Sequence, residues 1–320
     1  MGYLYIILAA ITFSTMEIAG KVISNVINPF QLNFLRFLIG GLILLPSTIK
    51  ILKNKGIKLN RKDFGYFIIT GLLCVVISMS FFQFAIVYTK ASIVAIIFST
   101  NPIFTIPFAY LILKEDLNKA TIVSLVLSLI GIVCILNPFQ AAQGGNVTGI
   151  VLCVIAAFTF SIYSVVGKMK SYRYGSIAMN CITFLVGDMI MFILICISKL
   201  SIFKNAVSNS SFHIFSDIPL FQGINSSNIF VIIYLGVVVT GLGYLFYFLA
   251  MDNTSASTAS VVFFIKPALA PILALILLKE SIPFNTVMGI LFILFGSLMT
   301  FTQKKNKNPV CIEEKVKIND

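Results

Sequence analysis

Four charged residues stand inside long apolar stretches of the chain: Glu17, Arg36, Asp188 and Lys266. A charge is costly in hydrocarbon, so such residues face protein or a water-filled cavity and mark sites of binding or proton transfer. At about 1.5 Å per helical residue, Glu17 lies roughly 8 Å and Arg36 roughly 10 Å below the same end of their stretches. Glu17 therefore has two open roles. It is either a carboxylate that carries a proton or binds a cationic group, or one half of a structural ion pair with Arg36.

Two polar residues each directly precede a proline near the middle of an apolar stretch. They are Lys266 before Pro267 and Asn101 before Pro102. Proline frees a carbonyl one turn earlier and bends the helix. A polar side chain beside such a bend at mid-membrane is a pointer to a binding site. We therefore predict that Pro102 and Pro267 bend their helices and that Asn101 and Lys266 line a cavity. The alternative for Lys266 is a fixed anchor that hydrogen-bonds loop carbonyls.

Three tyrosines complete the predicted cavity: Tyr163, Tyr244 and Tyr247. Aromatic faces hold apolar or cationic groups, although ordinary packing is the alternative for each ring. Asp188 is a further candidate for a structural ion pair, and its alternative is a packing contact with no functional role.

The composition requires a membrane to accommodate these stretches, because 58% of the 320 residues are hydrophobic and 11% are charged. Soluble domains carry about 25% charged residues, and a bilayer-spanning helix needs about 20 apolar residues. We predict an all-α integral membrane protein with ten transmembrane helices. The spans cover roughly residues 3–22, 30–49, 64–88, 91–113, 119–137, 147–168, 176–197, 229–250, 256–278 and 283–302.

The chain repeats itself. Residues 89–115 and 254–280 align at an offset of 165 with nine identities in 27 positions, among them the closing Lys-Glu pair. Earlier residues match at an offset of 147, as in Phe13 with Phe160 and Lys21 with Lys168. The 18 inserted residues fall in the long loop at about 198–228. Five spans per repeat is an odd number, so the halves, 1–138 and 146–302, are predicted to be inverted relative to each other, as in many secondary transporters.

Loop charges set the expected orientation. With the N-terminus in the cytoplasm, cytoplasmic segments hold 16 Lys and Arg residues and outer loops hold five, so both termini, including the charged tail 303–320, are predicted to be cytoplasmic. This bias and the tail account for the net charge of +12 without a nucleic-acid partner. No enzyme signature, cofactor motif or metal-ligand spacing is present, and the cysteines inside the apolar stretches, which are all except Cys311 of the tail, are predicted to be small buried thiols.

Two segments carry a family resemblance: FFQFAIVYTKASIVAIIFSTNPIFTIPFAYLILKE and YLFYFLAMDNTSASTASVVFFIKPALAPILALILLKE, supported by TFSTMEIAGK near the N-terminus. Both resemble the EamA domain of the drug/metabolite transporter superfamily. The resemblance covers about Gly2 to Thr302 and implies ten spans as two inverted five-helix EamA repeats around a central cavity. Many relatives carry Trp-Gly near Phe13, whereas this chain has no Trp, and Glu17 is not a general feature of the family.

The sequence therefore predicts a multi-pass cytoplasmic-membrane secondary transporter that moves a small metabolite, such as an amino acid or amine, by alternating access. The expected direction is export, and Glu17 would permit proton coupling. A non-transporting membrane sensor or scaffold is the alternative from another class. Small residues repeat in the fifth and tenth spans, so we expect these spans to pack on each other or to form a homodimer.

Overall fold

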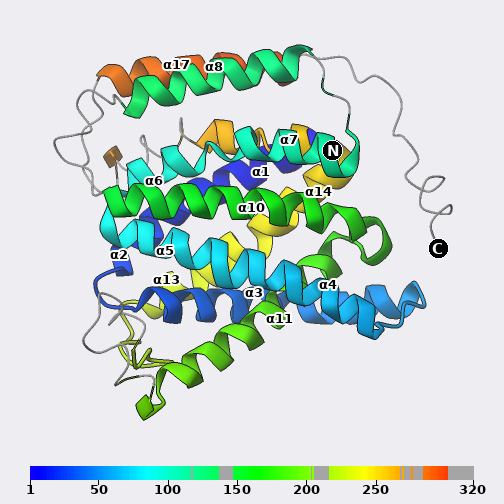
Figure 1. Ribbon diagram of the computed structural model, residues 1–320, viewed down its shortest axis with the longest axis vertical. Helices are drawn as coiled ribbons and strands as arrows, with labels where there is room; N and C mark the ends of the chain where they lie inside the picture. The colour runs from blue at the N-terminus through cyan, green and yellow to red at the C-terminus, as the bar shows by residue number, and fades with distance from the viewer. Residues whose placement is uncertain are drawn as a thin grey trace.

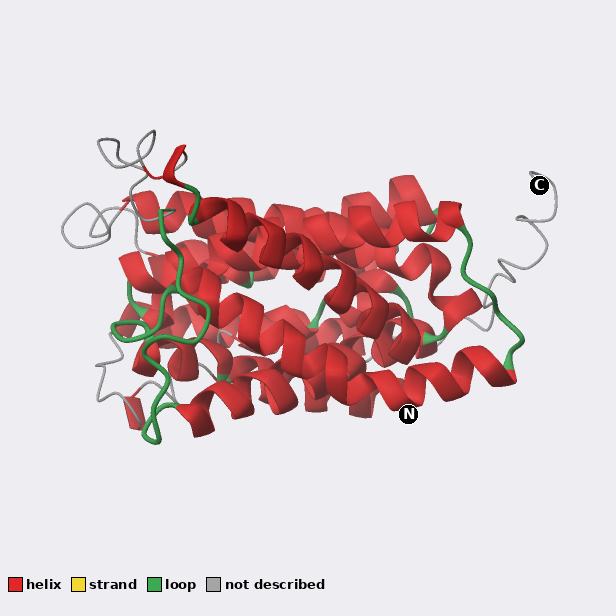
Figure 2. Cartoon of the chain, turned by 90° about the horizontal axis from the view of Figure 1, so that it is seen from below, coloured by secondary structure: helices red, strands yellow, loops and turns green. Residues whose placement is uncertain are grey.

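The computed structural model describes residues 1–115, 117, 119–136, 147–202, 204, 216–266, 269, 275–276 and 284–301. Every regular element within these ranges is helical, and the helices run side by side with their loops gathered at the two ends (Figure 2). A helix satisfies its own backbone hydrogen bonds, which is what an apolar sequence needs in a solvent without water. Pro267 and the predicted cytoplasmic tail lie outside the described residues.

Seven described helical stretches are long and apolar enough to cross a membrane. Shorter apolar helices at Ile122–Gly131, Ala256–Lys266 and Val287–Gly296 cover parts of the three remaining predicted spans. The seven stretches are Gly2–Ile23, Pro29–Asn54, Arg61–Tyr88, Ala91–Leu113, Val147–Tyr174, Ser176–Ser198 and Ile229–Asn253.

Three of the apolar stretches are interrupted helices. The first consists of α1 (Gly2–Ser14) and α2 (Met16–Ile23), and the fourth of α6 (Ala91–Phe98) and α7 (Asn101–Leu113). In the stretch Ala256–Lys266, the short helix α15 (Ala256–Ala259) ends well before Lys266.

A serine or threonine stands at each interruption and hydrogen-bonds back to a carbonyl of the preceding turn. The distances are 2.8 Å for Thr15 Oγ1, 2.5 Å for Ser99 Oγ and 2.7 Å for Ser260 Oγ. Such a bond competes with the helical ladder and often bends the helix. The sequence therefore places helix breaks one or two residues before Glu17 and Asn101.

Two other stretches contain π-helical segments at matching positions of the repeat. The segment η1 (Leu72–Ser78) joins α4 (Arg61–Gly71) to α5 (Met79–Tyr88). The segment η3 (Leu235–Gly243) joins α13 (Ile229–Tyr234) to α14 (Tyr244–Asn253). Ser78 and Gly243 are 165 residues apart, which is the offset of the repeat. π-Helical turns are rare in proteins, and many of those that occur lie at functional sites.

Three long, uninterrupted helices pack against these interrupted ones (Figure 1): α3 (Pro29–Asn54), α10 (Val147–Tyr174) and α11 (Ser176–Ser198). Asn28 caps α3 by accepting a hydrogen bond from the Phe30 amide, with Pro29 at the first helical position. Glycines allow close helix contacts: a Cβ built on Gly71 would lie 2.7 Å from the Gly187 nitrogen of α11.

The helices α8 (Lys119–Leu136) and α17 (Phe284–Phe301) lie side by side along one edge of the bundle (Figure 1). Four small residues on these helices are buried: Ser124, Gly131, Gly289 and Gly296. Small residues let helices approach closely, so the sequence expectation that these two spans pack on each other agrees with the described contact.

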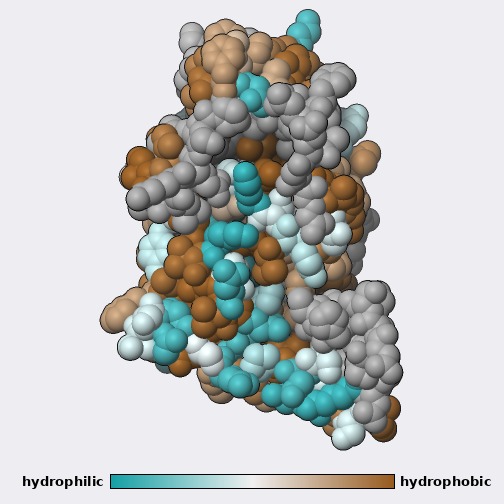
Figure 3. Space-filling view, turned by 90° about the vertical axis from the view of Figure 1, so that its left-hand side faces the viewer, coloured by the Kyte–Doolittle hydropathy of each residue, from teal (hydrophilic) through white to brown (hydrophobic). Residues whose placement is uncertain are grey.

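Both polar and large apolar residues lie on the surface. The end of the bundle that faces the viewer in Figure 3 gathers hydrophilic residues in its centre and lower part, with hydrophobic residues beside them and at the top. Large side chains such as Leu42, Met189 and Phe230 are exposed on the helices. Lipid can cover such side chains, whereas water would not favour them.

Candidate functional site

A buried ion pair joins the first stretch to the ninth. Lys266 Nζ contacts Glu17 Oε1, and both side chains are 1% exposed. The break at Thr15 makes Glu17 the second residue of α2, where the helix dipole favours a negative charge. Glu17 Oε2 has no hydrogen-bond partner among the described residues. Lys266 therefore reaches a carboxylate, and the partner of Glu17 is Lys266 rather than Arg36, which the sequence offered as its alternative partner.

Aromatic rings surround the ammonium end of the pair. Lys266 Nζ lies 5.2 Å from the centroid of Phe98 and 5.4 Å from that of Phe82. Cation–π contact of this kind stabilises a desolvated cation by up to about 2 kcal/mol.

Phe98 also belongs to a cluster that we call the phenylalanine quartet, formed by Phe13, Phe98, Phe160 and Phe263. Phe98 lies 5.4 Å from Phe160 and 5.7 Å from Phe263, and Phe13 stacks on Phe263 at 6.1 Å. The quartet consists of two pairs of repeat-related residues, 13 with 160 and 98 with 263. It therefore lies where the two halves meet, next to the ion pair.

The three predicted tyrosines pack around this quartet or beside it. Tyr247 lies 5.5 Å from Phe263, and its hydroxyl makes no well-formed hydrogen bond within the described part of the chain. Tyr244 lies 5.4 Å from Phe13. Tyr163 Oη donates to Asn180 Oδ1 at 3.2 Å, and the Asn180 amide donates to the Tyr244 carbonyl at 3.3 Å. The structure thus brings all three tyrosines to the quartet, since Tyr163 lies 5.6 Å from Phe160, and it also ties Tyr163 into a hydrogen-bonded link between helices.

Asn101 has a positioning role in the described conformation. Its Nδ2 donates to the Ala157 carbonyl at 3.0 Å and to Ser161 Oγ at 2.7 Å. Its Oδ1 accepts from Thr105 at 2.8 Å. Asn101 and Pro102 open α7 directly after the break at Ser99 and Thr100, so these bonds fasten the broken helix to α10.

Arg36 and Asp188 are both buried, and neither takes part in a salt bridge among the described residues. Arg36 Nε donates to Asn33 at 3.1 Å, Nη1 contacts Met16 Sδ at 3.6 Å, and the guanidinium lies 4.7 Å from the Phe37 ring centroid. Both carboxyl oxygens of Asp188 lack a hydrogen-bond partner within the described part of the chain. The ion-pair roles suggested for these two residues therefore have no counterpart in the described contacts.

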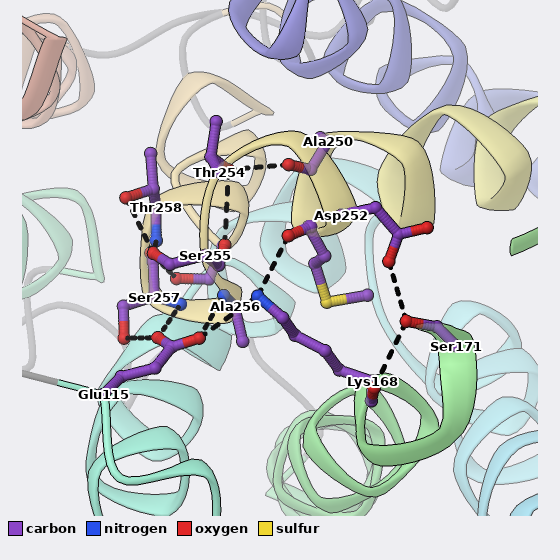
Figure 4. A network of polar contacts seen from close by, with 12 residues as sticks. Glu115, Lys168, Ser171, Ala250, Asp252, Thr254, Ser255, Ala256, Ser257 and Thr258 are labelled. Carbon is purple, nitrogen blue, oxygen red and sulfur yellow. Dashed lines mark hydrogen bonds and ion pairs between the residues drawn. The ribbon is translucent and has the colours of Figure 1, made fainter. Parts of the chain in front are cut away.

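One end of the bundle is fastened by a second carboxylate (Figure 4). Glu115 accepts hydrogen bonds from the Ala256 and Ser257 amides at 2.7 and 3.1 Å, and it pairs with Lys168 at 3.3 Å. Lys168 also donates to the Met251 carbonyl at 2.9 Å. Burial alone would raise the pKa of the Glu115 carboxyl, but Lys168 and the two amides together hold that pKa below its usual value.

The residues that sequence reasoning missed are mainly the quartet. The signal was present, because Phe13, Phe98, Phe160 and Phe263 are identical between the repeats. Within the described residues, no group of three or more His, Cys, Asp or Glu side chains is placed to hold a metal. The arrangement places a buried ionic pair on broken helices beside an aromatic cluster.

The chain is similar in sequence to proteins named as transporters and in fold to a solved structure. The model of the EamA-like transporter family matches residues 1–137 and 147–302. An "uncharacterized transporter" of Clostridium kluyveri is 43% identical over 313 residues, covering 96% of this chain and 95% of the relative. The "uncharacterized transporter YoaV" of Bacillus subtilis is 25% identical over 297 residues, covering 91% and 93%. One solved crystal structure has a TM-score of 0.68 at 16% identity and covers 93% of this chain and 95% of its own, a likeness that concerns the fold alone.

Proposed function

Because the chain belongs to the EamA-like transporter family, a branch of the drug/metabolite transporter superfamily, we propose that it is a secondary transporter that moves a small metabolite across the cytoplasmic membrane. The family and its relatives named as transporters support a multi-pass membrane transporter. The proposal adds a mechanism, alternating access between two inverted five-span repeats, with both termini in the cytoplasm and export as the direction.

Corresponding residues of the two halves make corresponding contacts, and this supports the inverted arrangement. Lys21 Nζ donates to the Ile86 carbonyl at 2.9 Å, and Lys168 Nζ donates to the Met251 carbonyl at the same distance. These pairs are related by the offsets 147 and 165. Two copies that make the same contact at opposite ends of a bundle can exchange their conformations, which is the structural basis of alternating access.

The observation that carries the proposal is the Glu17–Lys266 pair. Burying two opposite charges at 1% exposure costs desolvation free energy. Charged residues inside membrane spans are therefore rare, and they commonly mark a functional site. A metabolite with a charged group competes for one partner of the pair, and its apolar part lies against the phenylalanine quartet. Glu17 released from Lys266 becomes a carboxylate able to take up a proton, which offers a route to proton coupling. Amino acids, amines and small organic acids all carry such a charged group.

The alternative, a membrane sensor or scaffold, requires no exchange of partners at this pair. A scaffold would keep its function in the variants Lys266→Met and Glu17→Gln. A transporter would lose uptake in both while remaining in the membrane.

The experiment is substrate counterflow in proteoliposomes that contain the purified protein. Vesicles are loaded with a metabolite pool, and accumulation of labelled amino acids, amines and small organic acids is compared between the wild type and Lys266→Met. We expect counterflow only in the wild type. Equal signals in the two proteins would contradict the proposed site, and no counterflow with any compound would favour the scaffold.

Orientation is tested separately by labelling single cysteines from outside intact cells. Cysteine introduced at Lys55 should be protected and cysteine introduced at Ser226 should react. The two positions lie at opposite ends of the proposed topology, so equal accessibility would contradict it.

A further inference from the structure

Arg36 is a buried cation without a counter-ion in the described structure. It is fully buried, and no carboxylate of the described residues lies within salt-bridge distance. Arginine keeps its proton in proteins. A buried charge left unpaired is strongly destabilising, so a guanidinium in this position requires an explanation.

Two donors on the Arg36 side of this cluster lack partners among the described residues, whereas the acceptor without a hydrogen bond, Glu17 Oε2, belongs to the carboxylate already paired with Lys266. Arg36 Nη2 and Gln83 Nε2 have no hydrogen-bond partner among the residues that the structure describes, and both side chains are at least nine-tenths buried. Both lie against α2: Arg36 Nη1 contacts Met16, and Gln83 Oε1 is 3.6 Å from a Cβ built on Gly20. What is missing from this cluster is therefore an acceptor, preferably a negatively charged one.

The charges around α2 also indicate that the missing group is an anion. Arg36 and Lys266 carry two positive charges and Glu17 carries one negative charge, and Glu17 lies within electrostatic range of both cations. Ion pairing of Glu17 with Lys266 leaves one positive charge on Arg36. Asp188 on α11 does not neutralise it in a salt bridge among the described residues. An anion bound at Arg36 would bring the cluster to zero net charge.

We propose that Arg36 is the anion-binding residue of the transport site, and that the substrate is a small organic carboxylate without a compensating ammonium group. Arg36 binds the carboxylate with its two-pronged guanidinium, and Gln83 donates a further hydrogen bond. The apolar part of the substrate lies against the phenylalanine quartet. This inference rests on the proposed function and narrows its substrate class, since an amine would add to the positive charge and a zwitterion would leave it unchanged.

The test is a thermal-shift series on the purified full-length protein in detergent. The probes are two sets of compounds that share a carbon skeleton. The first set is 3-phenylpropionate, phenylalanine, 2-phenylethylamine and 3-phenylpropanamide, and the second is 4-methylpentanoate, leucine, 3-methylbutylamine and 4-methylpentanamide. A ligand that binds only the folded state raises its melting temperature. We expect one or both carboxylates to raise it by about 2 °C or more at millimolar concentration, with no rise from the matched amide or amine.

Two variants separate binding from folding. Arg36→Gln should lose the carboxylate response, whereas Arg61→Gln, the same change at an exposed position, should keep it. If Arg36→Gln does not fold, Gln83→Leu provides the second variant and should weaken carboxylate binding by about tenfold to a hundredfold, as loss of one hydrogen bond to a charged group predicts.

A response to the amine or the zwitterion alone would overturn the inference and leave the proposed transporter standing. An unchanged carboxylate response in Arg36→Gln would also overturn it, and so would the absence of any response to both carboxylates. The counterflow experiment then decides the transporter proposal independently.

Discussion

The Glu17–Lys266 ion pair predicts an unequal and non-additive response to substitution. Lys266→Met removes the ammonium group and leaves a carboxylate that is 0% exposed with no cation in contact. Removing one partner of a buried pair costs about 3–5 kcal/mol of the free energy of unfolding. Glu17→Gln leaves Lys266 unpaired instead, but that cation keeps the faces of Phe82 and Phe98. Since such contacts stabilise a desolvated cation by up to about 2 kcal/mol, we expect Glu17→Gln to cost only about 1–3 kcal/mol.

The double variant Glu17→Gln with Lys266→Met should recover much of the loss. Replacing both members of a buried pair removes both uncompensated charges and is often close to neutral. We therefore expect the double variant within about 1–2 kcal/mol of the wild type, with a coupling energy of at least about 2 kcal/mol between the two sites. The measurement is a double-mutant cycle of the free energy of unfolding in mixed micelles. Lys50→Met, at an exposed lysine of α3, serves as the control and should stay within about 0.5 kcal/mol of the wild type.

Additive single losses would refute this reasoning, because they would mean that the two charges do not depend on each other. An Arg36→Gln substitution that rescues Glu17→Gln would refute it in another way, since it would identify Arg36 as the true partner of Glu17.

Two further predictions concern the frame around the site. Gly71→Ala should cost about 1–3 kcal/mol of the free energy of unfolding, because its Cβ would lie 2.7 Å from the Gly187 backbone. Gly65→Ala is the control, since a Cβ there meets nothing within 4 Å. It should be neutral or stabilising by up to about 1 kcal/mol in the same unfolding assay. Glu115 has a lowered pKa, so its contribution should be complete above the ordinary value of 4.5 and disappear as the pH falls through the folded value. Glu115→Gln should lower stability by about 1–3 kcal/mol at neutral pH and reduce the loss of melting temperature on acidification; an unchanged acid slope would show that Glu115 does not contribute this dependence.

The helical stretches were predictable because their cause is local. A run of about 20 apolar residues must form a helix in a bilayer, and the repeat located the polar residues that interrupt such runs. The interruptions themselves were predicted only in part. The sequence marked the proline after Asn101, but Thr15 carries no such mark, and its effect depends on a side-chain bond to the preceding turn.

The pairing of Glu17 with Lys266 was not predictable from depth. Counting residues along a stretch gives height in the membrane but not the rotation of the helix about its axis, and rotation decides which neighbour a side chain meets. Glu17 and Arg36 have similar heights on consecutive stretches, which made them reasonable partners. The quartet shows a related limit: the repeat marks its four phenylalanines as identical, but in a chain with 30 phenylalanines only the fold shows that these four meet.

The contrast between Asn101 and Lys266 shows how a repeated frame can carry a site that is not repeated. The two residues occupy equivalent positions, yet Asn101 satisfies its amide within the protein by binding Ala157 and Ser161 on α10. The residue equivalent to Ser161 is Ser14, and the residue equivalent to Ser164 is Glu17, because 161 − 147 = 14 and 164 − 147 = 17. One half therefore joins its helices through neutral hydrogen bonds, and the other joins the equivalent helices through charges. Neutral bonds suit a permanent joint, whereas a charged pair can exchange its partner for a charged substrate, so the asymmetry of residue types favours Glu17 and Lys266 as the functional half.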